Sequence, residues 1–381
     1  MFVYILNFAL IFILGLWLLT NKTVFVENAS GIVNKPTLLL KNADRRKTLF
    51  LILLFSYWWF LSGFRGIGVG ADTVSYRVLY YEAAGYSWDF IWENFFEVLF
   101  MGREGIEPGY IVLEKLVSDI FGDYQYFLMV IAAIVLVCLF VFLKNNSKSL
   151  TSSTLLFSCL FWGFYLTTGI RQTIAVCLSV FLSYGFIKKR KLVPFLLMVA
   201  LAFLFHKSVI AVIPFYFFCN KKITPRYSTI VTFLFPVLFI FRNVYTQFVA
   251  SVGGYTSYAF YEGDTGAWTF TLVLGLVFIV TMWRRRIIIY NNPQATHYIN
   301  ALLVALLLTP MVFVNPGIMR LVHYYALYLL LLVPEIIESF NEKEKPLVFL
   351  VCAFVLISLY LLRNPQYEFF WQTEAGFMFL R

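Results

Sequence analysis

The chain has 381 residues, of which 61% are hydrophobic and 13% are charged, and its formal net charge is +10. A soluble domain carries about 25% charged residues, and a chain of this length has too little interior to hide so much apolar surface. The composition therefore excludes an ordinary soluble protein. The basic residues stand in short clusters between apolar runs, which is typical of membrane topology and argues against a nucleic-acid partner.

A helix of roughly 20 apolar residues crosses a bilayer core of about 30 Å. We therefore expect an all-α integral membrane protein with about 12 transmembrane helices, forming one domain over residues 1–381. The expected spans are residues 2–20, 48–64, 124–143, 150–168, 170–187, 192–206, 208–220, 227–241, 267–283, 296–314, 318–340 and 346–362. The first lacks a basic start and a small-residue cleavage site, so we interpret it as a retained helix. Residues 192–206 and 208–220 are short enough to form a broken or re-entrant pair.

The distribution of lysine and arginine predicts the orientation. Twenty of the 30 basic residues fall in connections on one side of the expected spans. They are Lys22, Lys35, Lys41, Arg45, Arg46, Lys47, Lys144, Lys148, Lys188, Lys189, Arg190, Lys191, Lys221, Lys222, Arg226, Arg284, Arg285, Arg286, Lys343 and Lys345. That side is cytoplasmic by the positive-inside rule, and both termini then face outward. The two longest connections, 65–123 and 242–266, are external, and we expect the working face there because long loops on a rigid scaffold carry function.

The first external segment contains two expected helices. Apolar residues recur at helical spacing over residues 88–100, which predicts an amphipathic helix in the outer interface. A second helix is expected to begin at Glu107–Pro108, because proline is favoured in a first turn. Its charged residues Glu114, Lys115 and Asp119 argue against a membrane span.

Several ionisable residues stand at the external edge of expected spans. Arg65 closes one span, Arg171 opens another, and His206 lies between two short ones. Arg320 opens a further span, with His323 on the same face. An arginine near a helix end can simply reach the lipid headgroups. Together, however, these residues suggest a cationic ring that binds phosphate, since the guanidinium grips phosphate oxygens at two points, and Gln172 stands beside Arg171 at a helix N-terminus that also favours an anion.

A glycine-rich run follows Arg65. Glycines at 66, 68 and 70 let the backbone turn tightly and approach a ligand closely, although a plain loop is the simpler interpretation. Asp72 is a candidate base or sugar ligand, and Tyr76 a candidate stacking partner. No strand precedes the run, so it is not a dinucleotide-binding fingerprint.

Motifs for a cofactor or a metal are missing from the sequence. There is no DxD pair, Walker motif, HExxH or GxSxG. The nearest approach to a metal-binding pair is Glu262–Asp264. We therefore expect no cofactor and no metal, and the energy must come from the substrate or from a gradient.

Four short motifs carry a family resemblance. They are Arg65-Gly-x-Gly-x-Gly-x-Asp72-Thr73-x-x-Tyr76, Glu107-Pro108-Gly109-Tyr110, Gly169-Ile170-Arg171-Gln172-x-Ile174-Ala175 and Phe205-His206-x-Ser208. In order and spacing, residues 48–340 resemble the EpsG family of multi-spanning bacterial polysaccharide polymerases, similar in role to Wzy polymerases of O-antigen, capsule and exopolysaccharide. The resemblance implies a GT-C-like fold in the bacterial cytoplasmic membrane. It also implies an undecaprenyl-pyrophosphate-linked oligosaccharide as the substrate. Membrane lipid, a chain-length regulator and a flippase of the same pathway are the other expected partners.

The expected reaction is glycosyl transfer without a metal. Arg171 and Arg320, with Arg65 as a third candidate, would stabilise the charge on the leaving lipid pyrophosphate. His206 or Asp72 would accept the proton of the attacking hydroxyl. The remaining expected substrate ligands are Arg65, Tyr76, Glu107, Tyr110, Gln172, Ser208 and His323. External aromatics could stack on sugars or simply anchor the interface; these are Trp88, Trp92, Tyr255, Tyr258 and Tyr261.

Three other functions remain open at this level. A twelve-helix transporter or flippase is the first, although the two halves of the chain do not match as such proteins usually require. An O-antigen ligase, which transfers the same kind of donor to another acceptor, is the second. An acyltransferase is the third.

Overall fold

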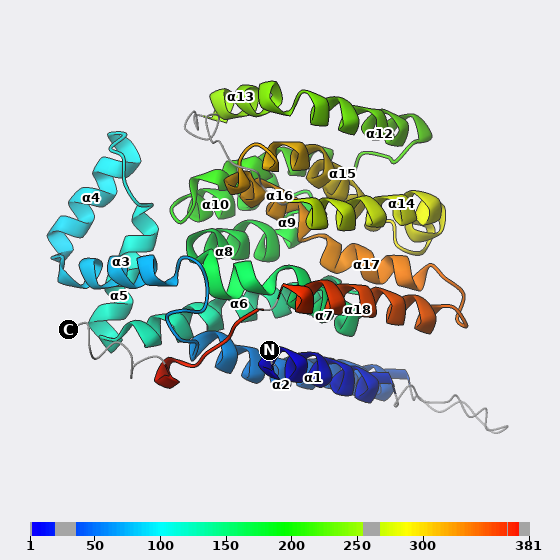
Figure 1. The fold of residues 1–381 in the computed structure, drawn as a ribbon, viewed down its shortest axis with the longest axis horizontal. Coiled ribbons are helices and arrows are strands. Elements are labelled where there is room, and N and C mark those ends of the chain that lie inside the picture. Colours follow the sequence, from blue (N-terminus) through cyan, green and yellow to red (C-terminus); the bar gives the residue numbers. More distant parts are fainter. Residues whose placement is uncertain (1, 20–35, 254–266, 364, 373–381) are drawn as a thin grey trace. The chain divides into compact units, whose positions relative to one another are not determined.

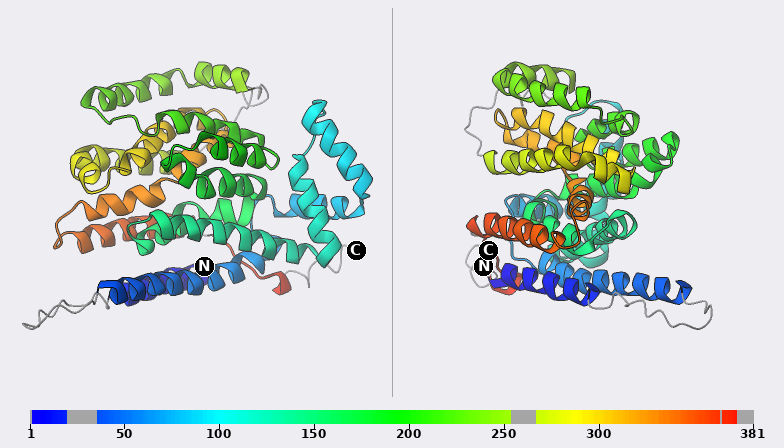
Figure 2. Two further views of the ribbon diagram at one scale, coloured as in Figure 1. Left: turned by 180° about the vertical axis from the view of Figure 1, so that it is seen from behind. Right: turned by 90° about the vertical axis from the view of Figure 1, so that its right-hand side faces the viewer.

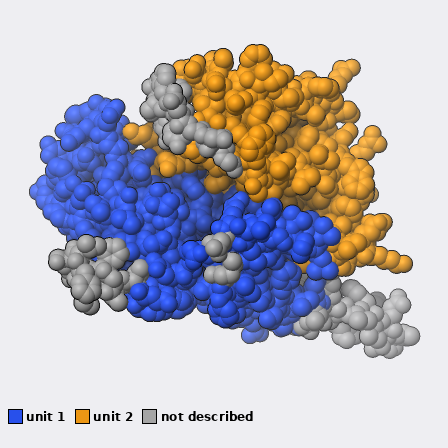
Figure 3. Space-filling model, viewed as in Figure 1, with its two compact units in different colours: residues 1–177, 350–381 blue, residues 178–349 orange. Residues whose placement is uncertain are grey.

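The computed structural model describes residues 2–19, 36–253, 267–363 and 365–372, and every regular element among them is a helix (Figure 1, Figure 2). The all-α prediction is confirmed for this part of the chain. The contacts between residues divide the chain into two compact units (Figure 3). Unit 1 consists of Met1–Cys177 and Leu350–Arg381, and unit 2 consists of Leu178–Phe349. The expectation of a single membrane domain stays a prediction.

Unit 1 is built from both ends of the chain. Its elements are α1 (Phe2–Leu19), α2 (Pro36–Gly63), α3 (Thr73–Gly85), α4 (Trp88–Phe100), α5 (Pro108–Phe121), α6 (Tyr124–Asn146), α7 (Leu150–Leu160), the π-helical turn η1 (Gly163–Thr168), α8 (Ile170–Val176) and most of α18 (Lys345–Leu362). Helix α2 packs along α6, and α1 packs against α2 and α7. Figure 1 and Figure 2 show α1 and α2 side by side.

Aromatic rings fill the centre of unit 1. The Trp58 ring is fully buried and lies 5.4 Å from Phe140, 5.5 Å from Phe157 and 5.3 Å from Trp162, measured between ring centroids. Its indole Nε1 donates a hydrogen bond to the Asn7 side chain at 2.7 Å. This bond satisfies a polar group that would otherwise be costly to bury, and it ties α1 to α2.

Hydrogen bonds show how the ends of the first helices are arranged. The Tyr57 hydroxyl donates to the Val3 carbonyl at 3.0 Å, and Gln125 donates to the Arg65 carbonyl at 3.3 Å. At the opposite end of the same bundle, Lys144 donates to the Thr48 hydroxyl at 2.9 Å. The first three expected spans therefore run in alternating directions, as the predicted topology requires. Which end faces the cytoplasm stays a prediction from the basic residues.

The segment between α2 and α6 contains three helices. Helix α4 begins after Ser87, whose hydroxyl accepts a hydrogen bond from the Phe90 backbone nitrogen at 3.2 Å. Helix α5 begins with Pro108 directly after Glu107, where the sequence places its start. Helix α5 contacts both α3 and α4 in unit 1. That this segment lies on the external face stays a prediction.

Unit 2 has shorter and more broken elements. They are η2 (Cys177–Leu182), α9 (Tyr184–Lys188), α10 (Leu192–Phe203), η3 (Lys207–Val212), α11 (Ile213–Phe218), α12 (Pro225–Ile240), α13 (Arg242–Gly253), α14 (Trp268–Asn291), α15 (Ala295–Val312), η5 (Pro316–Ile318), α16 (Met319–Ala326), α17 (Leu329–Glu338) and the start of α18. Helix α15 contacts α12, α13, α14, α16 and α17, so it is the central helix of this unit. Fourteen of its residues are buried.

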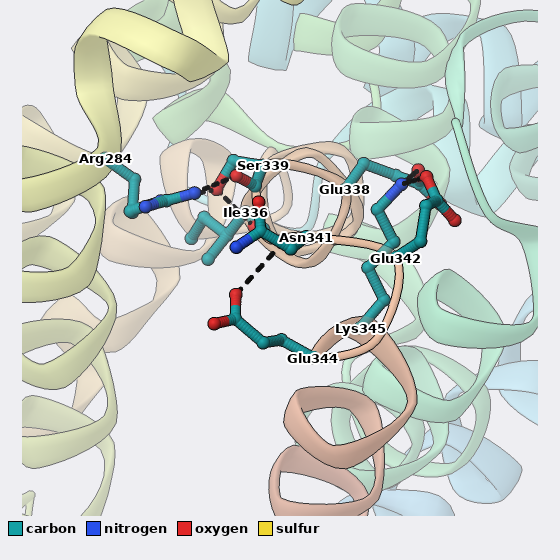
Figure 4. Close-up of polar contacts among 8 residues, drawn as sticks. All are labelled: Arg284, Ile336, Glu338, Ser339, Asn341, Glu342, Glu344 and Lys345. Atoms are coloured by element: carbon teal, nitrogen blue, oxygen red, sulfur yellow. Dashed lines mark hydrogen bonds and ion pairs between the residues drawn. The ribbon is translucent and has the colours of Figure 1, made fainter.

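The basic connections of unit 2 gather at one end. Arg284 donates to the Ser339 hydroxyl at 3.2 Å, and Lys345 pairs with Glu338 at 2.9 Å (Figure 4). Asn300 donates to the carbonyls of Cys219 at 2.7 Å and Lys221 at 2.8 Å, and Pro225 and Arg286 line one pocket. This grouping agrees with the assignment of these connections to one side of the membrane.

Aromatic rings from three other segments of unit 2 pack against one another. The ring of Trp268 lies 4.6 Å from Phe313 and 5.6 Å from Phe239, between centroids. The three residues lie at the beginning of α14, after the end of α15 and near the end of α12. Since the expected spans place all three positions at the external edge, their contact agrees with the predicted alternation of these helices.

The structure does not confirm the expected number of membrane spans. Among the described residues, five helices are long and apolar enough to cross a bilayer, or up to seven if two bent pairs count as single spans. The five are Phe2–Leu19, Tyr124–Asn146, Ile170–Lys188, Ala295–Val312 and Lys345–Leu362, and the pairs are Pro225–Ile240 with Arg242–Ser251, bent by 93°, and Pro316–Ala326 with Leu329–Glu338, bent by 51°. Other apolar helices, such as α10, are shorter than a bilayer core requires. The expected number of about twelve transmembrane helices is not confirmed and stays a prediction.

Cysteine labelling tests the orientation. With the five native cysteines replaced, a single cysteine near Asp72 is expected to react with a membrane-impermeant thiol reagent in intact cells. A cysteine near Lys189, in a basic connection, is the matched control and is expected to react only after lysis. The reverse pattern would overturn the topology. The same external labelling is expected near Glu262, which lies outside the described residues.

Candidate functional site

The glycine-rich run after α2 is packed against its own chain. Gly70 has a φ of +99°, and a Cβ at this position would lie 2.1 Å from the Thr167 carbonyl oxygen. The Thr73 hydroxyl is 2.7 Å from the Val69 carbonyl and 3.2 Å from that of Thr167. The backbone at Gly70 therefore lies close to η1, and the predicted close approach to a ligand stays a prediction. Asp72 stands half-buried at the start of α3 and makes no side-chain capping bond there.

Arg65 lies in a different environment from the one expected of a substrate ligand. Its guanidinium is buried and donates to the Ser62 carbonyl at 2.5 Å and to the Thr167 carbonyl at 3.5 Å. The Ser62 hydroxyl donates to the Leu166 carbonyl at 2.7 Å. Together these bonds fasten the end of α2 to η1. A substrate-binding role for Arg65 stays a prediction.

The segment after α18 contacts the end of α2 and the start of the glycine-rich run, a contact that was not predicted from the sequence. The Gly66 backbone nitrogen donates to the Glu368 carbonyl at 2.8 Å, and the Phe370 nitrogen donates to the Phe64 carbonyl at 3.1 Å. The Tyr367 hydroxyl donates to the Leu61 carbonyl at 2.7 Å. Residues 365–372 thus hold the first part of the glycine-rich run. The cluster of aromatic residues after the last span is the only sequence signal that points to docking.

Arg171 is the centre of the polar cluster in unit 1. It lies at the start of α8, and its Nη1 is 2.7 Å from Oε2 of Glu107. Its guanidinium carbon is 5.9 Å from the centre of the Tyr76 ring, within the range of a cation–π contact. The side chain of Arg171 is 28% exposed, so its charge reaches the surface of the unit. Two expected substrate ligands, Glu107 and Tyr76, therefore contact the expected catalytic arginine. Gln172, the next residue, is buried.

Two further polar groups lie deeper in this cluster. Tyr110 is fully buried, with its ring 5.8 Å from that of Tyr76. Glu114 is 1% exposed, and its Oε1 makes no hydrogen bond in the described structure. Burial raises the pKa of Glu114 to about 8, against the lowering effects of the Tyr110 hydroxyl and the Arg171 charge. Burial also raises the pKa of Tyr110.

Sequence reasoning missed Glu114 as a member of this cluster. It used the residue only as an argument against a membrane span. A usable signal existed, because Glu107, Tyr110 and Glu114 are spaced three and four residues apart, which puts them on one face of a helix. That face is the one that α5 turns toward Arg171.

Unit 2 holds a second group of candidate residues. The Ser208 hydroxyl, on η3, lies 3.1 Å from the Tyr324 hydroxyl on α16, and the two elements are packed together. His206 immediately precedes η3, and Arg320 stands in the first turn of α16; both are half-buried. His323 is buried, with its ring 5.8 Å from Phe270. The segments of His206 and Arg320, more than a hundred residues apart in the chain, are thus neighbours. Tyr324 is a member that sequence reasoning missed.

The candidate residues are therefore divided between the two units. Unit 1 contains Arg65, Asp72, Tyr76, Glu107, Tyr110, Arg171 and Gln172, and unit 2 contains His206, Ser208, Arg320 and His323. A cationic ring that joins the two groups stays a prediction. Tyr255, Tyr258, Tyr261, Glu262 and Asp264, named as candidates from the sequence, lie outside the described residues, as do Lys22 and Lys35.

Comparisons with known proteins give one match. The family model described as the EpsG family matches residues 48–371, which is most of the chain and contains both groups of candidate residues. No curated protein and no solved structure matches the chain.

Proposed function

Because the chain belongs to the EpsG family of Wzy-type, exopolysaccharide polymerase-like membrane proteins, we propose that it is a polysaccharide polymerase. It joins undecaprenyl-pyrophosphate-linked oligosaccharide repeat units on the external face of the bacterial cytoplasmic membrane. Family membership carries this proposal. The partly exposed, paired Arg171 supports it, since an arginine near lipid headgroups suits a lipid pyrophosphate.

The proposed reaction is a direct glycosyl transfer. A hydroxyl oxygen of one repeat unit attacks the anomeric carbon of the sugar on the lipid carrier, forming the new glycosidic bond. The bond from that carbon to the pyrophosphate oxygen breaks, and the lipid pyrophosphate leaves with the electron pair. The hydroxyl proton passes to a base, for which His206 and Asp72 remain the two candidates. Arginine charge rather than a metal ion offsets the negative charge that develops on the leaving group.

The contacts of Arg171 support its role at the leaving group. Glu107 engages one terminal nitrogen of the guanidinium at 2.7 Å, and Tyr76 lies under its face. Arginine has five N–H donors, so this arrangement fixes the side chain and leaves donors for phosphate oxygens. A preorganised charge of this kind does not have to be ordered during the reaction.

The group in unit 2 supplies the other proposed contacts. Arg320, in the first turn of α16, is the second arginine proposed to bind phosphate oxygens of the substrate. Ser208 and Tyr324, hydroxyl to hydroxyl at 3.1 Å, form a polar pair suited to sugar hydroxyls. His206, at the start of η3, could take a proton from a hydroxyl bound there.

Deletion of the gene is expected to abolish long glycan while single repeat units remain on the lipid carrier. The reason is that repeat units are still made and moved across the membrane, but are no longer joined. Glycan length profiles from deletion and complemented strains, run beside extracted lipid-linked sugars, measure this. Normal polymer length without the gene would overturn the proposal. Long polymer that is no longer transferred to its lipid anchor would favour a ligase, and repeat units trapped inside the cell would favour a flippase.

A further inference from the structure

A buried carboxyl lies behind the proposed anion site. Glu114 is on α5, on the face that also carries Tyr110 and follows Glu107. Only 1% of its surface is exposed, and Oε1 makes no hydrogen bond with the residues described. The described ion pairs include Arg171 with Glu107 but none that involves Glu114. Within the described part of the chain, the carboxyl therefore has no direct counter-ion.

Titratable groups from four helices surround this carboxyl. They are Glu82 and Tyr80 on α3, Tyr110 on α5, Tyr124 on α6 and Arg171 on α8. Among them the only cation is Arg171, which already holds Glu107 at 2.7 Å. Burial of an ionised carboxylate without a paired cation is very costly, and such a group keeps its proton instead.

We propose that Glu114 is a positioning residue for the anion site at Arg171: it stays uncharged, so that Glu107 alone competes with a lipid pyrophosphate for the guanidinium. The inference rests on the proposed function, because that function supplies the anion. If both carboxyls were ionised, Arg171 would face two negative charges and its attraction for phosphate would fall. The neutral acid therefore preserves a net positive charge for the ligand to meet.

The raised pKa of Glu114, about 8, makes the inference testable. Below this pH the carboxyl is protonated and the anion site is intact. Above this pH the Glu114 carboxyl ionises, and an anion binds well only to those protein molecules in which Glu114 is protonated. At about pH 9, one unit above the pKa, roughly one tenth of the molecules have a neutral Glu114. Affinity for an anion is therefore expected to fall up to about tenfold between about pH 6.5 and about pH 9.

Binding of undecaprenyl pyrophosphate measures this effect. The full-length protein is placed in nanodiscs of phosphatidylcholine, and the Kd is determined across that pH range. The wild type is expected to lose affinity with rising pH, whereas Glu114→Gln, which cannot ionise, is expected to bind with nearly the same Kd throughout. Glu93→Gln removes an exposed carboxyl on α4 and is the matched control. It is expected to follow the wild type.

A surface variant gives a second measurement that does not touch the buried position. Glu82 is exposed on α3, and its negative charge raises the pKa of Glu114. Glu82→Gln removes that charge, so the pKa of Glu114 should fall and the loss of affinity should begin at a lower pH than in the wild type. A residue with a merely structural role would not move this midpoint.

The outcomes separate this inference from the proposed function. If the wild type and Glu114→Gln lose affinity alike, or if Glu82→Gln leaves the midpoint in place, the role of Glu114 is overturned and the polymerase proposal stands. If Glu114→Gln binds undecaprenyl pyrophosphate normally but forms no polymer at any pH, Glu114 acts in the reaction itself and the positioning role is overturned. If the wild type binds no undecaprenyl pyrophosphate at any pH, both proposals fall.

Discussion

Replacing Arg171 with lysine is expected to remove most polymer formation while the protein still folds and inserts. Lysine keeps the charge, but it loses the planar fork that can hold Glu107 and a phosphate oxygen at once. Loss of a preorganised contact to the leaving group costs about 3 kcal/mol of transition-state stabilisation, which corresponds to a little over a hundredfold in rate. Polymer length profiles at equal membrane expression measure the effect. Arg320→Lys is expected to show a similar loss.

Arg242→Lys is the matched control for these two variants. Arg242 donates to the Phe239 carbonyl at 3.2 Å and lies 5.3 Å from the centre of the Phe239 ring, so its described contacts are local and involve no candidate residue. We expect nearly normal polymer from this variant. If the arginines only reach for lipid headgroups, all three lysine variants should behave alike, because lysine does so as well. Wild-type polymer from Arg171→Lys and Arg320→Lys would defeat the phosphate-binding role.

Hydrophobicity and basic clusters were sufficient to predict the helical class and the alternation of several helices. The contacts of Arg284 with Ser339 and of Lys345 with Glu338 follow the same rule, since connections on one side of a membrane meet at one end of the bundle. Helix interruptions were harder to predict. The expected span 150–168 changes from α-helix to a π-helical turn at Gly163, and the expected span 318–340 bends by 51° between α16 and α17. Hydropathy averages over such breaks and does not register them.

The sequence motifs named candidate residues, but they did not predict which partners those residues contact. The motifs marked Arg171, Glu107 and Tyr76, and the structure brings these three together. They also marked Arg65, whose guanidinium donates to backbone carbonyls and whose role as a substrate ligand stays a prediction. A motif cannot tell a ligand-binding arginine from one that fastens helices, because both need a fixed position. Glu114 was missed for a related reason: its importance comes from burial beside Arg171, and burial depends on tertiary packing.

The glycine-rich run offers the second large effect, this time on folding. Gly70→Ala is expected to lower the stability of the protein strongly and with it the amount in the membrane. The φ of +99° is unfavourable for any residue with a Cβ, and the added carbon would lie 2.1 Å from the Thr167 carbonyl oxygen. Because that oxygen belongs to the backbone of η1, it cannot rotate away. We expect a loss of at least about 2 kcal/mol, from backbone strain and from displacement of the Thr73 contact.

Gly85→Ala separates this effect from a general intolerance of the segment. Gly85 ends α3, and a Cβ there would meet no atom within 4 Å. Alanine also favours a helix over glycine, so this variant should melt at or slightly above the wild-type temperature. Thermal unfolding of the detergent-solubilised proteins, followed by tryptophan fluorescence, compares the two. Equal melting temperatures for Gly70→Ala and Gly85→Ala would show that the run is not pressed against η1, and the close packing of residues 65–73 on Thr167 would have to be abandoned.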